Sequence, residues 1–469
     1  MKRFDAAVIG GGILGCFAAR NLRRWNISTV LLEAAEDVCT GITRANSAIC
    51  YPGYDNRPGS LKARMTVRGN QNFDTLCREL EVPFSRCGSL LVSYDPESAA
   101  RLERKLRHGI QNGVPGLRLL SGAEAEAMEP MLKPGVVSAL YAPSTGTVNP
   151  WQLGIAAYEN ALQNGAEAML NAEVLGIQRT ADGYILQTGG ESIFCKVLLN
   201  CAGLYADRVQ ELAFPPSVRL RWDSAEYLVL DSMARKPGCV IFHQAQSCGK
   251  GITVIPCVEG NLLISGTRMP LRTPFATTPE GLRELHAAAK QLLPEVDLTQ
   301  VIRSFGAVRP NPYLESGESI HDFCIENPAG GFYSLIGIKT PGLTCCDQLG
   351  RYLAEKAAAY LGAEPNPGFD PHRRAISCHD HEIICQCEHI TRGQILEAIA
   401  RGATTLDGVK RRVGSGMGRC QGSRCTWEIE KLLEDAKHGT LCHPQHRRRR
   451  GGDRRRKGRC SGRRKRPAG

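Results

Sequence analysis

The sequence predicts a protein of the α/β and α+β classes with three parts. These are a discontinuous Rossmann-like nucleotide-binding domain, a substrate domain built on an antiparallel sheet, and a small helical metal-binding domain. Three observations carry this prediction: a strand, a glycine-rich turn and a helix open the chain, alternating apolar and polar residues fill its middle, and four cysteines form two close pairs after residue 380. A chain of 469 residues has room for two or three such domains.

The nucleotide-binding domain is expected to be assembled from separate segments. A strand at 5–10, a helix at 13–25 and a strand at 28–33 form one βαβ unit. Apolar runs at 197–200 and 331–337 predict two more buried strands. We assign to this domain residues of about 1–79, 146–214 and 311–362, and to the substrate domain residues of about 80–145 and 215–310.

The turn of the first βαβ unit has the pattern G-x-G-x-x-G. Gly10 suits a tight turn, Gly12 lets a pyrophosphate approach the backbone, and Gly15 lets the helix pack on the strand. Glu33 ends the next strand, eighteen residues after Gly15, where its carboxylate can accept the two ribose hydroxyls. The pattern predicts a dinucleotide cofactor, and NAD and FAD enzymes share it.

The C-terminal third is predicted to hold a linker and a separate domain. After a helix at 349–361, the residues GAEPNPG cannot continue it, so a linker is expected over 363–377. A compact domain over 378–437 follows, with helices at 391–401 and 426–436. Because the cofactor site precedes this linker, we expect it to be independent of the C-terminal domain.

The four paired cysteines predict a metal centre. Cys385 and Cys387 form a C-x-C pair, and Cys420 and Cys425 form a C-x4-C pair thirty-two residues later. Four thiolates can enclose either zinc or an iron–sulfur unit, and the spacing leaves both open.

The net charge of +12 lies at the end of the chain. Residues 447–469 hold thirteen Lys or Arg and one Asp, which leaves 46 basic and 46 acidic residues upstream. We expect 438–469 to be a disordered basic tail, because it has little to bury. It has no aromatic residue to stack on bases, so we expect no specific nucleic-acid partner.

The sequence favours a cytoplasmic protein. Its first residues lack the apolar region and cleavage site of a signal peptide, and no apolar run reaches the length of about 18 residues that spans a membrane. We expect membrane association to be peripheral at most. The twenty cysteines fit a reducing compartment, most of them as buried thiols.

Ordered blocks over about 5–362 resemble the D-amino-acid-oxidase-type FAD-dependent oxidoreductase family. Within it the chain is most similar to the glycerol-3-phosphate dehydrogenase and L-2-hydroxyglutarate dehydrogenase branch. The blocks are GITRANSA at 41–48, GYD at 53–55, GSLKAR at 59–64, NCAGLYAD at 200–207 and GIKTPGLT at 337–344. The resemblance implies FAD as the cofactor, with contacts from Gly10, Gly12, Ile13, Leu14, Gly15, Glu33, Thr43, Ser47, Val174, Gly203, Gly337, Gly342, Leu343 and Thr344.

The resemblance also implies a catalytic set. Arg309, in FGAVRP, matches the arginine that holds the substrate's carboxylate or phosphate, although a structural salt bridge is an alternative. Lys339 is expected to add positive charge beside the flavin, with a solvated loop lysine as the alternative. Tyr51 stands where the glycerol-phosphate branch has a histidine. A phenol is a poor base, so Tyr51 and Tyr54 either act at the substrate or shape the pocket.

Residues around the four cysteines resemble the bacterioferritin-associated-ferredoxin-like domain, which implies a [2Fe–2S] cluster. Together the two resemblances imply a dehydrogenase that moves a hydride from a small anionic hydroxy compound to flavin N5. Its electrons would leave through the cluster to an acceptor protein or a partner flavoprotein subunit. Amine, opine or amino-acid oxidation, a redox-sensing nucleic-acid regulator, and a flavin with only a structural role are the alternatives.

Overall fold

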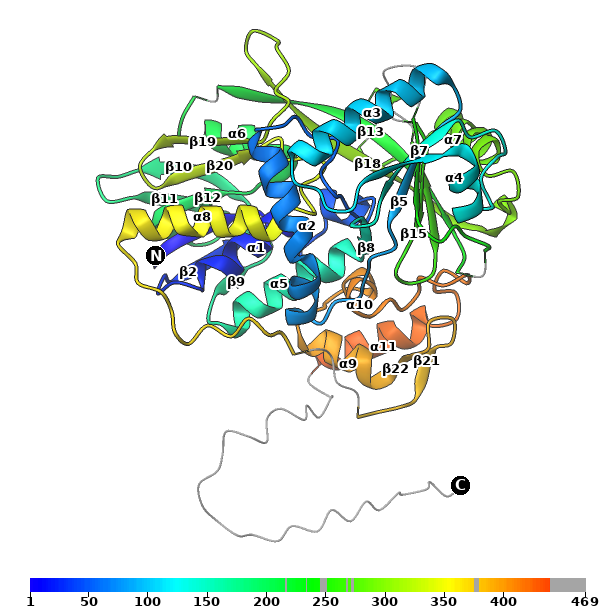
Figure 1. Ribbon diagram of the computed structural model, residues 1–469. Coiled ribbons are helices and arrows are strands. Elements are labelled where there is room, and N and C mark those ends of the chain that lie inside the picture. The colour runs from blue at the N-terminus through cyan, green and yellow to red at the C-terminus, as the bar shows by residue number, and fades with distance from the viewer. Residues whose placement is uncertain are drawn as a thin grey trace, which may run out of the picture.

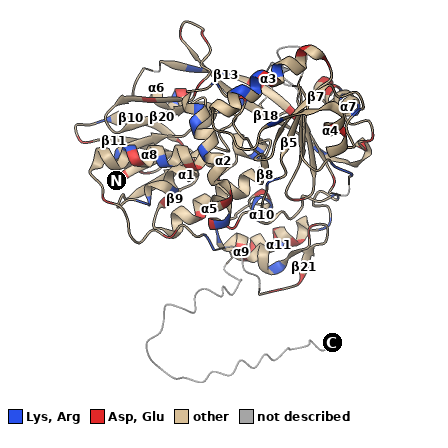
Figure 2. Ribbon diagram, in the orientation of Figure 1, with Lys and Arg blue, Asp and Glu red and all other residues tan. Residues whose placement is uncertain are grey.

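The computed structural model describes residues 1–438 apart from 216, 233, 245–250, 267–268, 271–273 and 375–378. Two large sheets lie side by side, and a small helical region sits below both (Figure 1). Acidic and basic residues are interspersed over the surface (Figure 2). The predicted tail lies outside the described residues from 439 onward.

The first sheet has eight strands, in the order β10-β11-β12-β1-β2-β9, with β20 beside β12 and β19 beside β20. The links from β12 to β1, from β1 to β2, from β2 to β9 and from β12 to β20 are parallel. The strands are β1 (Lys2–Ile9), β2 (Thr29–Leu32), β9 (Glu167–Met169), β10 (Val174–Arg179), β11 (Tyr184–Thr188), β12 (Ser192–Asn200), β19 (Cys324–Ala329) and β20 (Phe332–Ile336).

Helices cover this sheet and bury its main core. The first helix packs between two others, with Phe17, Ala157 and Leu353 from the three helices in one fully buried cluster. The helices of this layer are α1 (Ile13–Leu22), α2 (Leu61–Glu79), α5 (Pro150–Gln163) and α8 (Cys346–Leu361). Because β1 and β2 are parallel and central, their carboxyl ends meet at one edge, where doubly wound sheets bind ligands.

The second sheet has nine strands and is antiparallel except where β5 pairs with β14. Its longest pairing joins β13 to β18, which lies at an edge of the sheet. The strands are β5 (Ser89–Ser93), β6 (Arg118–Ser121), β7 (Ser138–Ala142), β13 (Val218–Leu230), β14 (Val240–His243), β15 (Thr253–Pro256), β16 (Leu262–Ser265), β17 (Met269–Pro270) and β18 (Val301–Leu314). Helices α3 (Pro96–Gln111), α4 (Gly122–Met128) and α7 (Pro279–Leu292) pack around it.

Short elements join the two large parts. A three-stranded sheet consists of β3 (Ile49–Cys50), β4 (Phe84–Ser85) and β8 (Gly146–Val148). The remaining connections carry α6 (Ala206–Glu211) and the 3-10 turns η1 (Ile42–Ala45), η2 (Gly203–Tyr205) and η3 (Leu298–Gln300).

The C-terminal region is small and mainly helical, with a core of its own that includes Ile395, Val409 and Leu432. Its elements are β21 (Ile383–Cys385), β22 (Ile390–Thr391), α9 (Arg392–Ala400), α10 (Leu406–Val413) and α11 (Thr426–Lys437). The preceding segment runs along the nucleotide-binding part. In it, Pro365 forms an isolated bridge with Trp25, and Arg373 pairs with Glu159 of α5 at 2.8 Å.

The predicted fold class is confirmed, and the predicted elements differ from the observed ones mainly at their ends. The helix expected over 13–25 ends at Leu22, and α8 begins three residues earlier than expected. The helix α10 was not predicted. Every strand of the first sheet falls in the three segments proposed for the nucleotide-binding domain, which supports that division, and β18 crosses its boundary at 310.

Among the described residues, no helix is long and apolar enough to cross a membrane.

Candidate active site and cluster loop

The glycine turn between β1 and α1 is shaped by close backbone contacts. A Cβ on Gly10, whose φ is +101°, would lie 2.6 Å from the carbonyl oxygen of Cys201, and a Cβ on Gly15 would lie 1.8 Å from that of Gly10. A Cβ on Gly12 would instead meet only Thr43 Oγ1, at 3.6 Å. The turn is therefore closed toward the sheet and open at Gly12, where the N-terminus of α1 offers amides and a positive dipole to an anion.

Glu33 follows β2 and braces this turn. Its Oε2 accepts a hydrogen bond from the Gly11 amide at 2.5 Å, and its Oε1 accepts one from the Ala35 amide at 2.9 Å. Thr43 Oγ1 accepts from the first amide of α1, that of Ile13, at 3.0 Å. Glu33 also lines the cavity described next, and contact between its carboxylate and a ribose stays a prediction.

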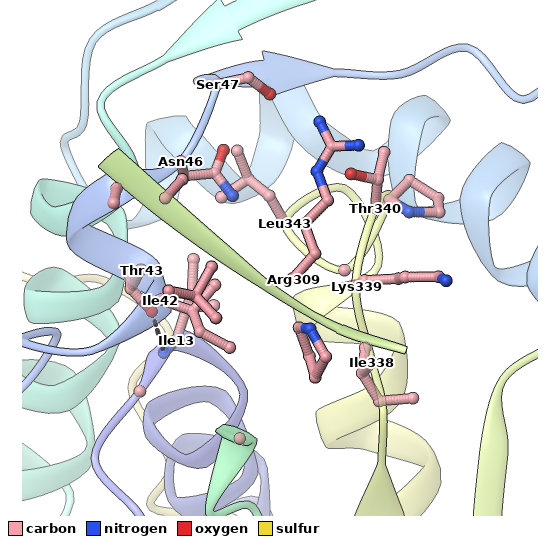
Figure 3. Close-up of a pocket in the computed structure, with 18 of the residues that line it drawn as sticks. Ile13, Ile42, Thr43, Asn46, Ser47, Arg309, Ile338, Lys339, Thr340 and Leu343 are labelled. Carbon is pink, nitrogen blue, oxygen red and sulfur yellow. Dashed lines mark hydrogen bonds between the residues drawn. The ribbon is translucent and has the colours of Figure 1, made fainter. Parts of the chain in front are cut away.

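A cavity of about 960 Å³ starts at this turn and ends between the two sheets. Its size is at the upper end for cofactor sites. The predicted residues in its wall are Gly10, Gly12, Ile13, Leu14, Glu33, Thr43, Ser47, Tyr51, Tyr54, Val174, Gly203, Arg309, Lys339, Gly342 and Leu343. Figure 3 shows several of them converging on this space.

Three predicted cofactor residues lie behind the wall. Gly15 is in the helix–strand contact, as expected for the third glycine. Gly337 has φ +69°, and a Cβ there would lie 2.6 Å from Pro312. Thr344 is buried and its Oγ1 accepts a hydrogen bond from the Tyr51 amide at 2.9 Å. Direct FAD contact by these residues stays a prediction, and their visible role is to hold neighbouring wall segments together.

The far end of the cavity carries the predicted catalytic residues. Arg309 comes from β18, and Lys339 comes from the loop after β20. Lys339 Nζ donates a hydrogen bond to Asn311 Oδ1. The side-chain nitrogen of Asn311, Nδ2, in turn donates one to Asp223 Oδ2 at 2.8 Å. Asn311 was missed in the sequence, although strand alternation would have placed it on the same face as Arg309.

Tyr51 and Tyr54 have different surroundings. Burial raises the pKa of Tyr51 to about 12, a hydrogen bond with Ser47 and the nearby charge of Arg309 oppose this rise, and the phenol stays neutral. Figure 3 shows the Arg309 guanidinium extending from β18 on the side of the cavity that carries Ser47. Burial also raises the pKa of Tyr54 well above its usual value, and Tyr54 packs in an apolar cluster with Leu102.

The four predicted metal-binding cysteines lie together in the C-terminal region. Cys385 ends β21 and Cys425 precedes α11, and both are buried, whereas Cys387 and Cys420 are half-buried. The thiols of Cys387 and Cys420 interact directly, as do those of Cys385 and Cys425. Among the described residues, no three His, Cys, Asp or Glu side chains already surround one point.

Two thiol pairs nevertheless fit a [2Fe–2S] unit, because each of its irons takes two thiolates. The pKa of Cys420 is lowered overall, although burial by itself would raise it. The lowering comes from hydrogen bonds with the Cys387 thiol, the backbone amides of Gly422 and Arg424, and the Ser423 hydroxyl. Such donors stabilise a cluster-bound thiolate. Close packing also shapes this loop, since a Cβ on Gly418 would lie 2.4 Å from Cys387 Cβ.

The other cysteines and histidines are accounted for differently. Apart from these four, twelve described cysteines are free thiols, including the adjacent Cys345 and Cys346 in the main core. His379 and His381 precede the cluster cysteines and are exposed. Cys378, which precedes these histidines in the sequence, lies outside the described residues.

Two families match consecutive parts of the chain. Residues 5–356 match the family described as FAD dependent oxidoreductase, and residues 383–435 match the BFD-like [2Fe-2S] binding domain. These matches identify FAD as the cofactor and the four cysteines' domain as one that binds a [2Fe–2S] cluster.

Curated relatives span both parts or one of them. A glycerol 3-phosphate dehydrogenase of Caloramator mitchellensis is 37% identical over 455 residues, which cover 92% of this chain and 94% of that protein. The mitochondrial L-2-hydroxyglutarate dehydrogenase of Homo sapiens is 34% identical over 242 residues, 48% of this chain and 52% of that protein.

A solved structure confirms the fold. Dithionite-reduced L-alpha-glycerophosphate oxidase of Mycoplasma pneumoniae, with FAD bound, aligns with a TM-score of 0.73 at 24% identity, over 79% of this chain and 98% of that chain. With a family match over most of its length, the chain belongs to the FAD dependent oxidoreductase family, is similar to glycerol 3-phosphate dehydrogenase, and carries a C-terminal BFD-like [2Fe–2S] binding domain.

Proposed function

We propose that this chain oxidises a small anionic hydroxy compound, either glycerol 3-phosphate or a 2-hydroxy acid such as L-2-hydroxyglutarate. We propose further that its electrons leave through the [2Fe–2S] centre to an acceptor protein or a partner flavoprotein subunit. The observation that carries the substrate class is the position of Arg309 in the wall of the FAD cavity, near Tyr51 and Ser47. One relative that spans both domains is a glycerol 3-phosphate dehydrogenase, which supports the first substrate.

Arg309 is suited to binding the anionic group. A guanidinium keeps its charge at all ordinary pH values and can make two parallel bonds to a carboxylate or phosphate. Its position on a long paired strand fixes its backbone, since Arg309 is in register with Asp223 of β13. Binding at this point would orient the substrate's C–H bond along the cavity toward the cofactor.

Tyr51 is proposed to donate a hydrogen bond rather than to accept a proton. With a pKa raised to about 12 by burial, it remains a neutral phenol at physiological pH. Its backbone amide is tied to Thr344, so its position depends on the 337–344 loop. Tyr54, packed among apolar residues, is proposed to shape the pocket.

Lys339 is proposed to place positive charge along the same wall. Its bond to Asn311 fixes the ammonium group beside β18. When bound, FAD accepts a hydride and the cluster accepts single electrons. A cation held in position stabilises negative charge that develops at this wall, with little reorganisation during the reaction.

The free thiols also suggest where the protein works. Besides the four cluster cysteines, twelve described cysteines are free, and a reducing compartment would keep them so. We therefore propose a cytoplasmic location.

An anaerobic substrate screen tests the function. Purified protein is mixed with sn-glycerol 3-phosphate, L-2-hydroxyglutarate, lactate, proline or an opine, and the loss of flavin absorbance is followed. We expect rapid loss with one of the first two compounds. Loss only with proline or an opine would establish the amine or opine alternative, and no loss with any compound would contradict the proposal.

A further inference from the structure

The unpredicted helix α10 of the cluster domain binds the nucleotide-binding domain through a buried ion cluster. Both oxygens of Asp37 are held by Arg412, with Nη1 2.7 Å from Oδ2 and Nη2 2.9 Å from Oδ1. Arg411 Nη2 adds a bond to Oδ2 at 3.0 Å. The side chains of Arg412 and Asp37 are 1% and 3% exposed.

Asp37 belongs to the loop that follows Glu33 and supports the glycine turn. The next residue, Val38, packs on Gly11, where a Cβ would lie 2.9 Å from Val38 Cγ1. The Cys39 amide then donates to the carbonyl oxygen of Gly11 at 2.9 Å. Other residues of this loop, Ala34, Ala35 and Thr40, line the FAD cavity. A direct chain of contacts thus runs from α10, through Asp37 and the loop at 34–40, to the glycine turn.

The arginine partners of Asp37 belong to the cluster domain, so this contact exists only while that domain is docked. A buried carboxylate without a compensating charge is strongly disfavoured. Burial alone would raise the pKa of Asp37, and Arg412 and Arg411 bring it below the usual value instead. When α10 is absent or displaced, Asp37 loses both arginine partners, and the loop at 34–40 loses the contacts that hold it from this side.

We propose that Arg411 and Arg412 are positioning residues of the FAD site, acting through Asp37. The docked cluster domain holds the loop at 34–40 in the conformation that supports the glycine turn and faces the cofactor. FAD binding and cluster-domain docking are then coupled, and coupling is reciprocal. It rests on FAD binding and is independent of the substrate.

Arg401 offers a matched control within the same interface. Its Nη1 lies 2.9 Å from Glu159 Oε2 on α5, so it also joins the cluster domain to the nucleotide-binding domain. Glu159 is buried but lies outside the cavity wall. Glu159 also lies 3.8 Å from Arg412 Nε, so Arg401→Gln removes one contact of this interface and leaves both arginine partners of Asp37 in place.

The experiment measures FAD affinity on the full-length chain after FAD removal, by quenching of flavin fluorescence during titration. We expect Asp37→Asn and Arg412→Lys to bind FAD about tenfold more weakly, within the usual range of coupling between linked sites. Arg401→Gln should stay within about twofold of the unchanged protein. Arg412→Lys retains the charge and loses the paired geometry, so it remains informative if Asp37→Asn fails to fold.

Hydrogen exchange supplies the reciprocal measurement. FAD should slow amide exchange in α10 of the unchanged chain and of Arg401→Gln, and should have little effect there in Asp37→Asn. Unchanged FAD affinity in both Asp37→Asn and Arg412→Lys would overturn the proposal. Equal losses in Arg401→Gln would also overturn it, because they would show that general docking, rather than Asp37, controls the site.

Discussion

The two ends of the FAD cavity are made from different parts of the chain. At the nucleotide end, the glycine turn presents backbone from one short segment, Gly10 to Ile13, braced by Glu33. At the substrate end, side chains of Tyr51, Arg309 and Lys339 arrive from three segments, and the first lies 258 residues before the second. Backbone recognition depends on a local pattern of glycines, whereas side-chain recognition depends on how distant segments meet. We therefore expect the first end to select the cofactor and the second to select the substrate.

The sharpest way to break the nucleotide end is Gly12→Asp. The new side chain has room, because a Cβ there meets only Thr43 Oγ1 at 3.6 Å. Aspartate is also a good N-cap, so α1 should remain stable. Its carboxylate would occupy the anion position and repel the pyrophosphate, and we expect FAD content after purification to fall to near zero. Gly238→Asp, where a Cβ would be in open space, is the control. A folded Gly12→Asp protein with full FAD content would show that the phosphates bind elsewhere.

Removing the cluster tests whether both cavity ends work without it. Cys420→Ser should remove about two irons and two sulfides per chain, because a [2Fe–2S] unit needs four thiolates. Since α10 remains in place, FAD should stay bound and substrate should still reduce it, while electron delivery to an external acceptor slows. Iron and sulfide analysis and stopped-flow absorbance measure these effects, and Cys324→Ser is the control. Stoichiometric zinc in anaerobically purified protein would contradict the assignment of a [2Fe–2S] cluster. Full turnover with the external acceptor in the cluster-free variant would show that the cluster has a structural role only.

Arg309→Lys separates the substrate end from the nucleotide end. The change keeps the positive charge and removes the two-bond geometry. We expect the KM for substrate to rise by roughly ten- to a hundredfold, the size of one charge-assisted hydrogen bond, with unchanged FAD content. Arg303→Lys, on the same strand but exposed, is the matched control. Equal kinetics in the two variants would remove Arg309 from the substrate site.

We expect the substitution Tyr51→Phe to have the smallest effect of the four, and to change only the rate of flavin reduction. Its raised pKa keeps the phenol protonated as pH passes about 10, the ordinary tyrosine value. Flavin reduction should therefore show no inflection from Tyr51 there, and Tyr51→Phe should slow reduction by about fivefold, the equivalent of one hydrogen bond. An inflection near neutral pH that disappears in Tyr51→Phe would identify Tyr51 as an ionising base instead.

Local patterns in the sequence were sufficient for the fold class, the glycine turn and the iron–sulfur domain. Each of these depends on residues close together in the chain: a strand, turn and helix for the cofactor, and two short cysteine pairs for the metal. Helix α10 was missed because it is short and its arginines resemble a solvated basic run. The segment predicted as a simple linker is instead bound along α1 and α5, through contacts such as that of Arg373 with Glu159.

Only the tertiary structure showed which distant groups meet. Asn311 positions Lys339, Ser47 and Arg309 surround the phenol of Tyr51, and Asp37 finds its partners on α10. The physical reason is that a charge in a protein interior has to be paired, and a pair is defined by distance in space. Sequence spacing determined what this chain can bind, whereas packing between domains decided which side chains hold the binding site in place.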